Sequence, residues 1–141
     1  MAIKITSDST CDLSAEQLKL HNIELFPLCI SMGNQCLRDG LEITPDDIYA
    51  HVDAGGDICT TSALNPADYA DRFAALSKEY DAVIHINISA EFSSCFQNAV
   101  LASQDFDNVY VVDSRNLSTG HGHVVLRAAE LAESGMSAED I

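Results

Sequence analysis

Basic residues are scarce in this chain: seven lysines and arginines stand against 22 aspartates and glutamates, for a formal net charge of −15. The basic residues are scattered at Lys4, Lys19, Arg38, Arg72, Lys78, Arg115 and Arg127. Neutralising the phosphates of a nucleic acid or the head groups of an anionic membrane requires basic side chains clustered on one surface. The composition therefore argues against both as partners.

Long apolar runs and a leader sequence are also missing. No apolar stretch approaches the ~20 residues that a helix needs to cross a bilayer, and no secretory signal precedes the first expected strand. No Cys-x-x-Cys pair occurs among the five cysteines, which are Cys11, Cys29, Cys36, Cys59 and Cys95. We therefore expect a cytoplasmic protein without a transmembrane segment, whose buried thiols are all reduced.

The length of 141 residues and the 47% hydrophobic content suit a single domain with one buried core. Extended segments are expected at 3–6, 23–31, 82–89 and 109–112. Helices are expected at 14–21, from 45 to the Gly55-Gly56 pair, at 66–80, 92–103 and 118–134. This alternation predicts an α/β fold with a mostly parallel sheet and helices on both faces.

The strand at 82–89 carries the clearest pattern, with Ile84, Ile86 and Ile88 on one face and Val83, His85 and Asn87 on the other. A strand this apolar is typical of the centre of a sheet that is covered on both sides. We expect His85 and Asn87 to be hydrogen-bonded in the core. The helix at 92–103 is expected to turn its apolar residues inward: Phe92, Phe96, Ala99 and Val100.

Two short hydroxyl clusters, Thr60-Thr61-Ser62 and Ser93-Ser94, each stand where an extended or apolar segment gives way to a helical pattern. A helix N-terminus presents unpaired N–H groups and a partial positive charge, which suit a carboxylate or a phosphate. Asn65 can cap the helix that begins at Pro66, which leaves Thr61 and Ser62 free. Because the protein is so acidic, a bound anion must be held by dipoles and hydroxyls. The candidate ligand-binding residues are Thr61, Ser62, Ser93 and Ser94.

Three polar clusters follow the ends of expected strands: Asp8-Ser9-Thr10, the segment 89–94, and Asp113-Ser114. The carboxyl ends of parallel strands meet at one edge of a sheet, where ligands bind in such folds. We therefore expect the three clusters to meet along one rim.

Two enzymatic alternatives stay open at this point. A serine hydrolase would use Ser93 and would need a histidine within reach, but the Gly-x-Ser-x-Gly elbow is absent. A phosphotransfer or signalling domain would use His85 or His121 as the phosphate acceptor. The His121-Gly122-His123 run is a weak metal signal without nearby cysteines or spaced carboxylates, so neither a metal nor a cofactor is expected.

The order and spacing of several short pieces resemble the DegV family of bacterial fatty-acid-binding proteins over essentially the whole chain. The pieces are Thr6-Ser-Asp-Ser-Thr10 with Asp12-Leu13, Pro27-Leu28, Asp39-Gly40, Thr61-Ser62 with Pro66, Ser89 with Phe92-Ser93 and Gln97, and Asp113-Ser114 with Ser118, Gly120 and Gly122. This resemblance implies a two-lobed α/β protein that clasps one long-chain fatty acid and is not itself an enzyme. The protein would present the carboxyl group of the lipid to a partner fatty-acid kinase, which makes an acyl-phosphate.

By the same resemblance, Thr61, Ser62 and Ser93, with the amide of residue 94, would grip the carboxylate. Residues 1–141 would form the N-terminal lobe, and the C-terminal lobe would be absent. The segment Ser137–Ile141 reads as a capped helix start, so we also expect something C-terminal to be missing.

The chain departs from the usual family pattern beside the expected site. It has Ser94 for glycine, Ala90 for a hydroxyl residue, Cys95 for threonine and Phe96 for tyrosine, and Thr61-Ser-Ala-Leu64 for Thr-Ser-x-Pro. A side chain at position 94 would narrow the head-group pocket or add a donor.

Overall fold

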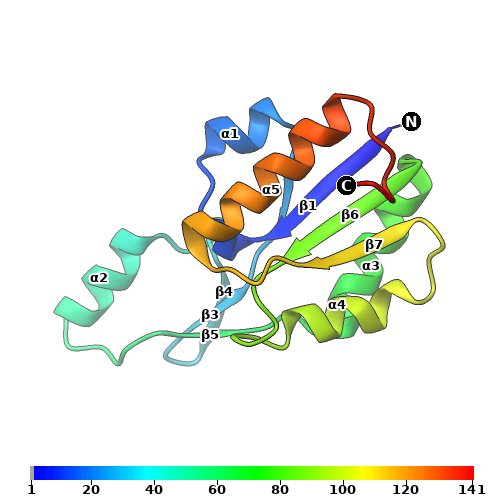
Figure 1. The fold of residues 1–141 in the computed structure, drawn as a ribbon. Helices are drawn as coiled ribbons and strands as arrows, with labels where there is room; N and C mark the ends of the chain where they lie inside the picture. Colours follow the sequence, from blue (N-terminus) through cyan, green and yellow to red (C-terminus); the bar gives the residue numbers. More distant parts are fainter. Residues whose placement is uncertain (1) are drawn as a thin grey trace.

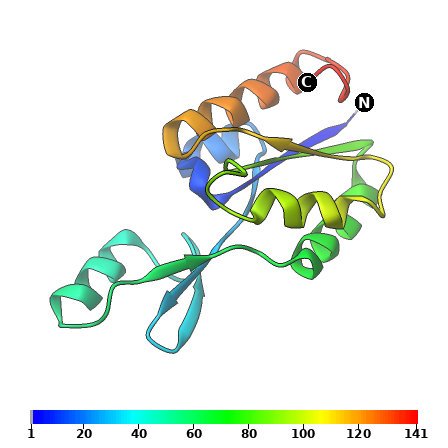
Figure 2. The same ribbon diagram turned by 60° about the horizontal axis from the view of Figure 1, so that its bottom comes forward.

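The computed structural model describes residues 2–141 and has a four-stranded parallel sheet at its centre (Figure 1). The strand order is β2-β1-β6-β7, with β1 at Ile3–Asp8, β2 at Glu24–Phe26, β6 at Ala82–Asn87 and β7 at Val109–Asp113. Helices α1 (Ala15–Leu20) and α5 (Ser118–Glu133) cover one face, and α3 (Pro66–Glu79) and α4 (Cys95–Ser103) cover the other (Figures 1 and 2). The predicted fold class is therefore confirmed.

The core consists of two apolar layers, one on each side of the sheet. The layer under α3 and α4 contains Phe26, Tyr69, Phe73, Val83, Cys95 and Ala99. The layer under α5 contains Ile5, Ile84, Ile86, Val125, Ala128 and Ala129. The alternation along β6 was predicted correctly for these residues, but Ile88 packs in the α3–α4 layer with Val83. Because β6 ends at Asn87, the alternation does not extend to Ile88.

Helix α4 begins later than the sequence pattern predicts, at Cys95 rather than at residue 92. The segment before it is a turn in which the N–H groups of Phe92 and Ser93 donate to the carbonyl oxygen of Ser89. Phe92 consequently points outward and is 66% exposed, so its predicted inward position is wrong. Ala99 is buried as expected, whereas Phe96 and Val100 are half-buried.

A smaller antiparallel sheet has the order β4-β3-β5 and projects from the main body (Figure 2). It contains β3 (Cys29–Met32), β4 (Gln35–Arg38) and β5 (Thr60–Ser62), and α2 (Pro45–Asp53) lies between β4 and β5 in the chain. Gly33 adopts a φ of 59° in the hairpin turn between β3 and β4, a conformation that glycine reaches without steric cost. The chain therefore reverses direction at Gly33, and β3 and β4 form an antiparallel hairpin.

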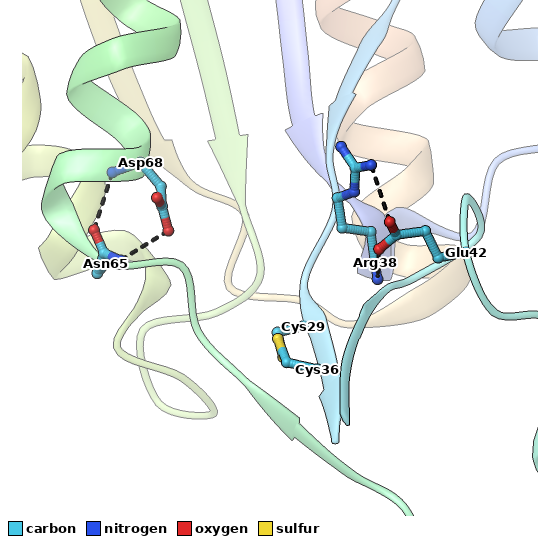
Figure 3. Close-up of a disulfide and its surroundings, with 6 residues drawn as sticks. All are labelled: Cys29, Cys36, Arg38, Glu42, Asn65 and Asp68. Carbon is cyan, nitrogen blue, oxygen red and sulfur yellow. Dashed lines mark hydrogen bonds and ion pairs between the residues drawn. A yellow bond between two sulfur atoms is a disulfide. The ribbon is translucent and has the colours of Figure 1, made fainter. Parts of the chain in front are cut away.

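The hairpin also corrects the cysteine prediction, because Cys29 and Cys36 form a disulfide (Figure 3). Their Cα atoms are 5.6 Å apart, a separation that a disulfide spans readily. Cys11, Cys59 and Cys95 are free. Sequence spacing did not indicate the pair, since the two positions approach only after the chain folds back at Gly33.

Capping side chains define the starts of α1 and α3, and the predicted cap at Asn65 is confirmed. Ser14 and Gln17 form a capping box at α1, and the side chain of Asn65 accepts a 3.0 Å hydrogen bond from the N–H of Asp68 at α3 (Figure 3). No helix within residues 2–141 has the length and apolar character that a membrane crossing requires.

Candidate functional site

Thr61 and Ser62 lie in a short strand rather than in a loop that enters a helix. Strand β5 pairs with β3 so that Thr61 is opposite Ile30 and Ser62 is opposite Cys29. Both residues are exposed, and the capping of α3 falls to Asn65. Because β5 is an edge strand, part of its backbone N–H and C=O groups has no partner in the sheet. The two residues are thus available to a ligand, as expected, but through a strand edge.

The strand geometry distinguishes these two hydroxyls. Successive side chains of a strand point to opposite faces, so the Thr61 and Ser62 side chains leave β5 on opposite sides. A single bound anion would therefore meet one of these side chains and the backbone of the other residue.

Ser93 and Ser94 stand at the N-terminus of α4, as predicted. Ser94 occupies the N-cap position, but its side chain makes no capping hydrogen bond and is exposed. Ser93 is half-buried, and its Oγ accepts a 3.2 Å hydrogen bond from the N–H of Cys95. One serine therefore serves the helix start, and the other keeps its hydroxyl free.

The two hydroxyl clusters flank one packed region. Leu64, two residues after Ser62, and Cys95, one residue after Ser94, belong to the same buried layer. The amide of Asn98 in α4 also donates a 2.7 Å hydrogen bond to the carbonyl oxygen of Leu64. These contacts fasten the segment after β5 to α4, while the convergence of the four hydroxyls on one anion stays a prediction.

Asp8 is the central buried polar group at the carboxyl end of the main sheet, where its side chain is fully buried. Its Oδ2 accepts a 2.7 Å hydrogen bond from the N–H of Ile88 and lies 3.4 Å from the amide nitrogen of Asn87. Its Oδ1 accepts from the N–H and the hydroxyl of Thr10, at 3.1 and 2.6 Å. One carboxylate thus joins the ends of β1 and β6.

Asp113 plays a similar part at the end of β7. Its Oδ1 accepts hydrogen bonds from the N–H of Ala90, at 3.2 Å, and of Arg115, at 2.8 Å. The N–H of Ser114 donates to the carbonyl oxygen of Asn87. The three polar clusters that the sequence placed at strand ends therefore do meet along one rim.

Two fully buried histidines complete this network. His85 Nδ1 lies 2.8 Å from the Thr6 hydroxyl, and burial lowers the pKa of His85 to about 3, with the nearby His121 and Arg72 acting in the same direction. His121 contacts the Ser7 and Thr10 hydroxyls at 3.0 and 3.2 Å. Burial also lowers the pKa of His121, against the opposing effect of Asp8. Both rings are therefore held neutral near pH 7.

His85 and Asn87 are hydrogen-bonded core residues, as expected, but each also has a buried atom without a protein partner. These atoms are Nε2 of His85 and Oδ1 of Asn87. Tyr69 also joins this network, because its hydroxyl accepts a 3.1 Å hydrogen bond from the Asn87 amide. The i, i+4 spacing with Phe73 indicated its burial but carried no signal for the polar contact.

The geometry gives little support to the two enzymatic alternatives. Both hydrogen bonds of the Ser93 hydroxyl go to Cys95 rather than to a histidine. Ser7, His121 and Asp8 form a serine–histidine–aspartate series, but Ser7 is fully buried and its hydroxyl donates to the carbonyl oxygen of Ile86 at 3.0 Å. His85 and His121 are equally inaccessible to a phosphate donor.

Metal binding at His121 and His123 is likewise unsupported. His121 is engaged in the buried network, whereas His123 is exposed. No cluster of three potential metal ligands occurs within residues 2–141. The intervening Gly122 serves packing: a Cβ there would lie 2.5 Å from the carbonyl oxygen of Cys11, so only glycine permits α5 to approach this closely.

Comparison with known proteins gives consistent matches along the whole chain. The family model described as "Uncharacterised protein, DegV family" matches residues 2–141. A DegV domain-containing protein of Clostridium perfringens is 36% identical over 141 residues, covering 99% of this chain and 50% of the relative. The chain spans about half the length of the curated relatives it matches.

Solved structures agree with the sequence matches. A DegV family protein from Thermus thermophilus, whose structure is named for fatty acid binding, has a TM-score of 0.91 and 38% identity over 99% of this chain and 50% of its own. DegV from Bacillus subtilis, named as a fatty acid binding protein, has a TM-score of 0.92 and 31% identity over 99% of this chain and 51% of its own. By fold, by sequence and by the extent of the match, the chain belongs to the DegV family.

Proposed function

We propose that residues 1–141 form the lobe of a fatty-acid-binding protein that holds the ligand's carboxylate through Thr61, Ser62, Ser93 and Ser94. The observation that carries the proposal is the attachment of two hydroxyl-bearing segments to one packed region, through Leu64 and the amide of Asn98. Solved relatives named for fatty acid binding share the fold over 99% of this chain.

Neutral donors suit this site better than cations do. Helix α4 presents the N–H groups of its first turn, apart from that of Cys95, which is bonded to Ser93, and edge strand β5 presents unpaired backbone groups. The arginines of the small sheet and of α3 are already engaged: Arg38 pairs with Glu42 at 3.1 Å, and Arg72 lies 3.8 Å from Glu24. An anion would thus be bound by dipoles and hydroxyls.

Most of the affinity for a long-chain fatty acid must come from its hydrocarbon tail. Burying about fifteen methylenes at ~0.8 kcal/mol each supplies on the order of 10 kcal/mol before the costs of association. Since the chain covers half of its relatives' length, we expect the other half to complete the tail's enclosure. Residues 1–141 alone should bind the lipid weakly or not at all.

Presentation to a kinase is the second part of the proposal and rests on the family resemblance. A partner fatty-acid kinase would transfer the γ-phosphoryl group of ATP to the bound carboxylate, giving acyl-phosphate and ADP. The exposure of Thr61, Ser62 and Ser94 supports it, because a carboxylate held there would stay within reach of a second protein. Trapping the acyl-phosphate with hydroxylamine, in the presence of kinase and ATP, tests this step.

Binding itself is tested by native mass spectrometry of the full protein that carries residues 1–141, purified without detergent. We expect a bound mass equal to one long-chain fatty acid, and saturable binding of oleate after delipidation. The 141-residue chain alone is the matched comparison. A full protein with no bound lipid and no affinity for oleate or palmitate would contradict the proposal.

A further inference from the structure

Ser93 differs from the other candidate hydroxyls in being tied to a fully buried residue. The N–H of Cys95 donates to Ser93 Oγ at 3.2 Å, and the same oxygen lies 3.1 Å from the Cys95 sulfur, to which the hydroxyl donates. Cys95 is a free thiol with no exposed surface. The serine oxygen is thus fixed by a backbone donor, and its hydrogen is directed at sulfur.

Cys95 also lies in the buried layer that contains Tyr69, a member of the polar network of the rim. Burial raises the pKa of Tyr69, so that its hydroxyl keeps its hydrogen. Tyr69 in turn accepts from the Asn87 amide, which lies 3.4 Å from Asp8. The Cys95 side chain is consequently enclosed by packed core residues, which restrict its rotation away from Ser93.

We infer that the Cys95 sulfur is a weak resting acceptor for the Ser93 hydroxyl, which turns its hydrogen from the sulfur to an incoming carboxylate; the inference rests on the proposed function. A thiol sulfur is a weak acceptor, whereas a carboxylate oxygen forms a short, charge-assisted hydrogen bond. Ligand binding therefore exchanges a weak bond for a strong one. The backbone N–H of Cys95 keeps the serine oxygen in place throughout.

This role predicts opposite effects for two small substitutions. In Cys95→Ser, a hydroxyl oxygen replaces the sulfur and competes with the carboxylate, so affinity for oleate should fall by about two- to tenfold, the range set by one net hydrogen bond. In Cys95→Ala, the competitor is gone and the backbone N–H remains, so affinity should stay at or above that of the unmodified protein. A purely structural role would make alanine the worse variant, because it leaves a cavity.

The test uses the full protein that carries residues 1–141, with calorimetric titration of oleate and of methyl oleate and thermal unfolding of each variant. The inference is supported if Cys95→Ser prefers the acid over the ester less than the unmodified protein does, while Cys95→Ala keeps the preference. The order of the variants in oleate affinity should also differ from their order in thermal stability. Equal affinities in the two variants, with normal binding by the unmodified protein, would overturn it.

A second readout needs no lipid. The infrared S–H stretching band of Cys95, assigned by difference against Cys95→Ala, should shift in Ser93→Ala because the thiol loses its hydroxyl partner. If the protein binds no oleate, the proposed function fails and this band alone decides the contact. An unchanged band in Ser93→Ala would overturn the inference.

Discussion

The N–H of Ile88 donates a 2.7 Å hydrogen bond to the fully buried Oδ2 of Asp8. This bond ties the end of β1 to the first residue after β6, where the segment that carries Ser93 begins. Asp113 holds the same segment from the β7 side through the N–H of Ala90. Two carboxylates thus fix the path of the backbone toward α4. These bonds hold in place the segment that carries Ser93.

Replacing Asp8 with asparagine should therefore be costly. The amide has one oxygen to serve donors that the carboxylate meets with two, which leaves a buried donor without a partner, and we expect a loss of ~1–3 kcal/mol in the free energy of unfolding. Chemical denaturation measures this change. Asp12→Asn is the matched control, since Asp12 is exposed and should change stability by less than ~0.5 kcal/mol. Equal effects of the two substitutions would contradict the role of Asp8.

The rim itself was predictable from the sequence, because polar residues directly follow apolar strands and parallel strands end at one edge. What the sequence could not reveal is which rim residue is buried. Asp8 and Asp113 both follow a strand, yet Asp8 is fully enclosed while Asp113 is half-buried. The difference arises because β1 is a central strand and β7 is an edge strand. The order of strands in a sheet cannot be read from the local pattern of apolar and polar residues.

His85 should make the protein less stable as the pH falls. Its pKa is about 3 in the folded protein against 6.5 ordinarily. Between these two pH values, His85 binds a proton in the unfolded chain but not in the folded protein. The stability is fully present above pH 6.5 and declines below it, by ~1.4 kcal/mol per pH unit for one proton. Unfolding measured at several pH values should show this slope reduced by one proton in His85→Gln. An unchanged slope would show that His85 is protonated in the folded state.

Thr61 and Thr60 offer a matched pair within one strand. Both are exposed in β5, but their side chains point to opposite faces. If the Thr61 hydroxyl contacts the carboxylate, Thr61→Val should weaken fatty-acid binding by ~1–3 kcal/mol, and Thr60→Val should leave it unchanged. Titration calorimetry on the full protein compares them. Loss of binding in Thr60→Val alone would place the ligand on the other face of β5.

The disulfide predicts a definite thiol count. With Cys29 and Cys36 joined, only Cys11, Cys59 and Cys95 remain free. Protein purified without reductant and then denatured should therefore react at these three cysteines with a thiol reagent, and at all five after reduction. Peptide mapping identifies the joined pair. Reaction at five cysteines before reduction would restore the sequence-based expectation of reduced thiols.

The positions of the candidate hydroxyls show where sequence reasoning ends. The capping roles of Ser14 and Asn65 were predictable, because the spacing of a capping residue and its partner is local. The placement of Thr61 and Ser62 in a strand was not, since β5 is only three residues long and exists through its pairing with β3. The exposure of Phe92 was missed for a similar reason. The turn at Ser89 moves the start of α4 to Cys95, and the spacing of apolar residues does not indicate such a turn.

The central claim is that hydroxyls and backbone dipoles, rather than cations, hold a fatty-acid carboxylate. The most direct measurement is the difference in binding free energy between oleate and methyl oleate, in the full protein and in Ser93→Ala. We predict a clear preference for the acid, reduced by ~1–3 kcal/mol in the variant, with unchanged binding of the ester. Equal affinity for acid and ester, or the same preference in both proteins, would contradict the account.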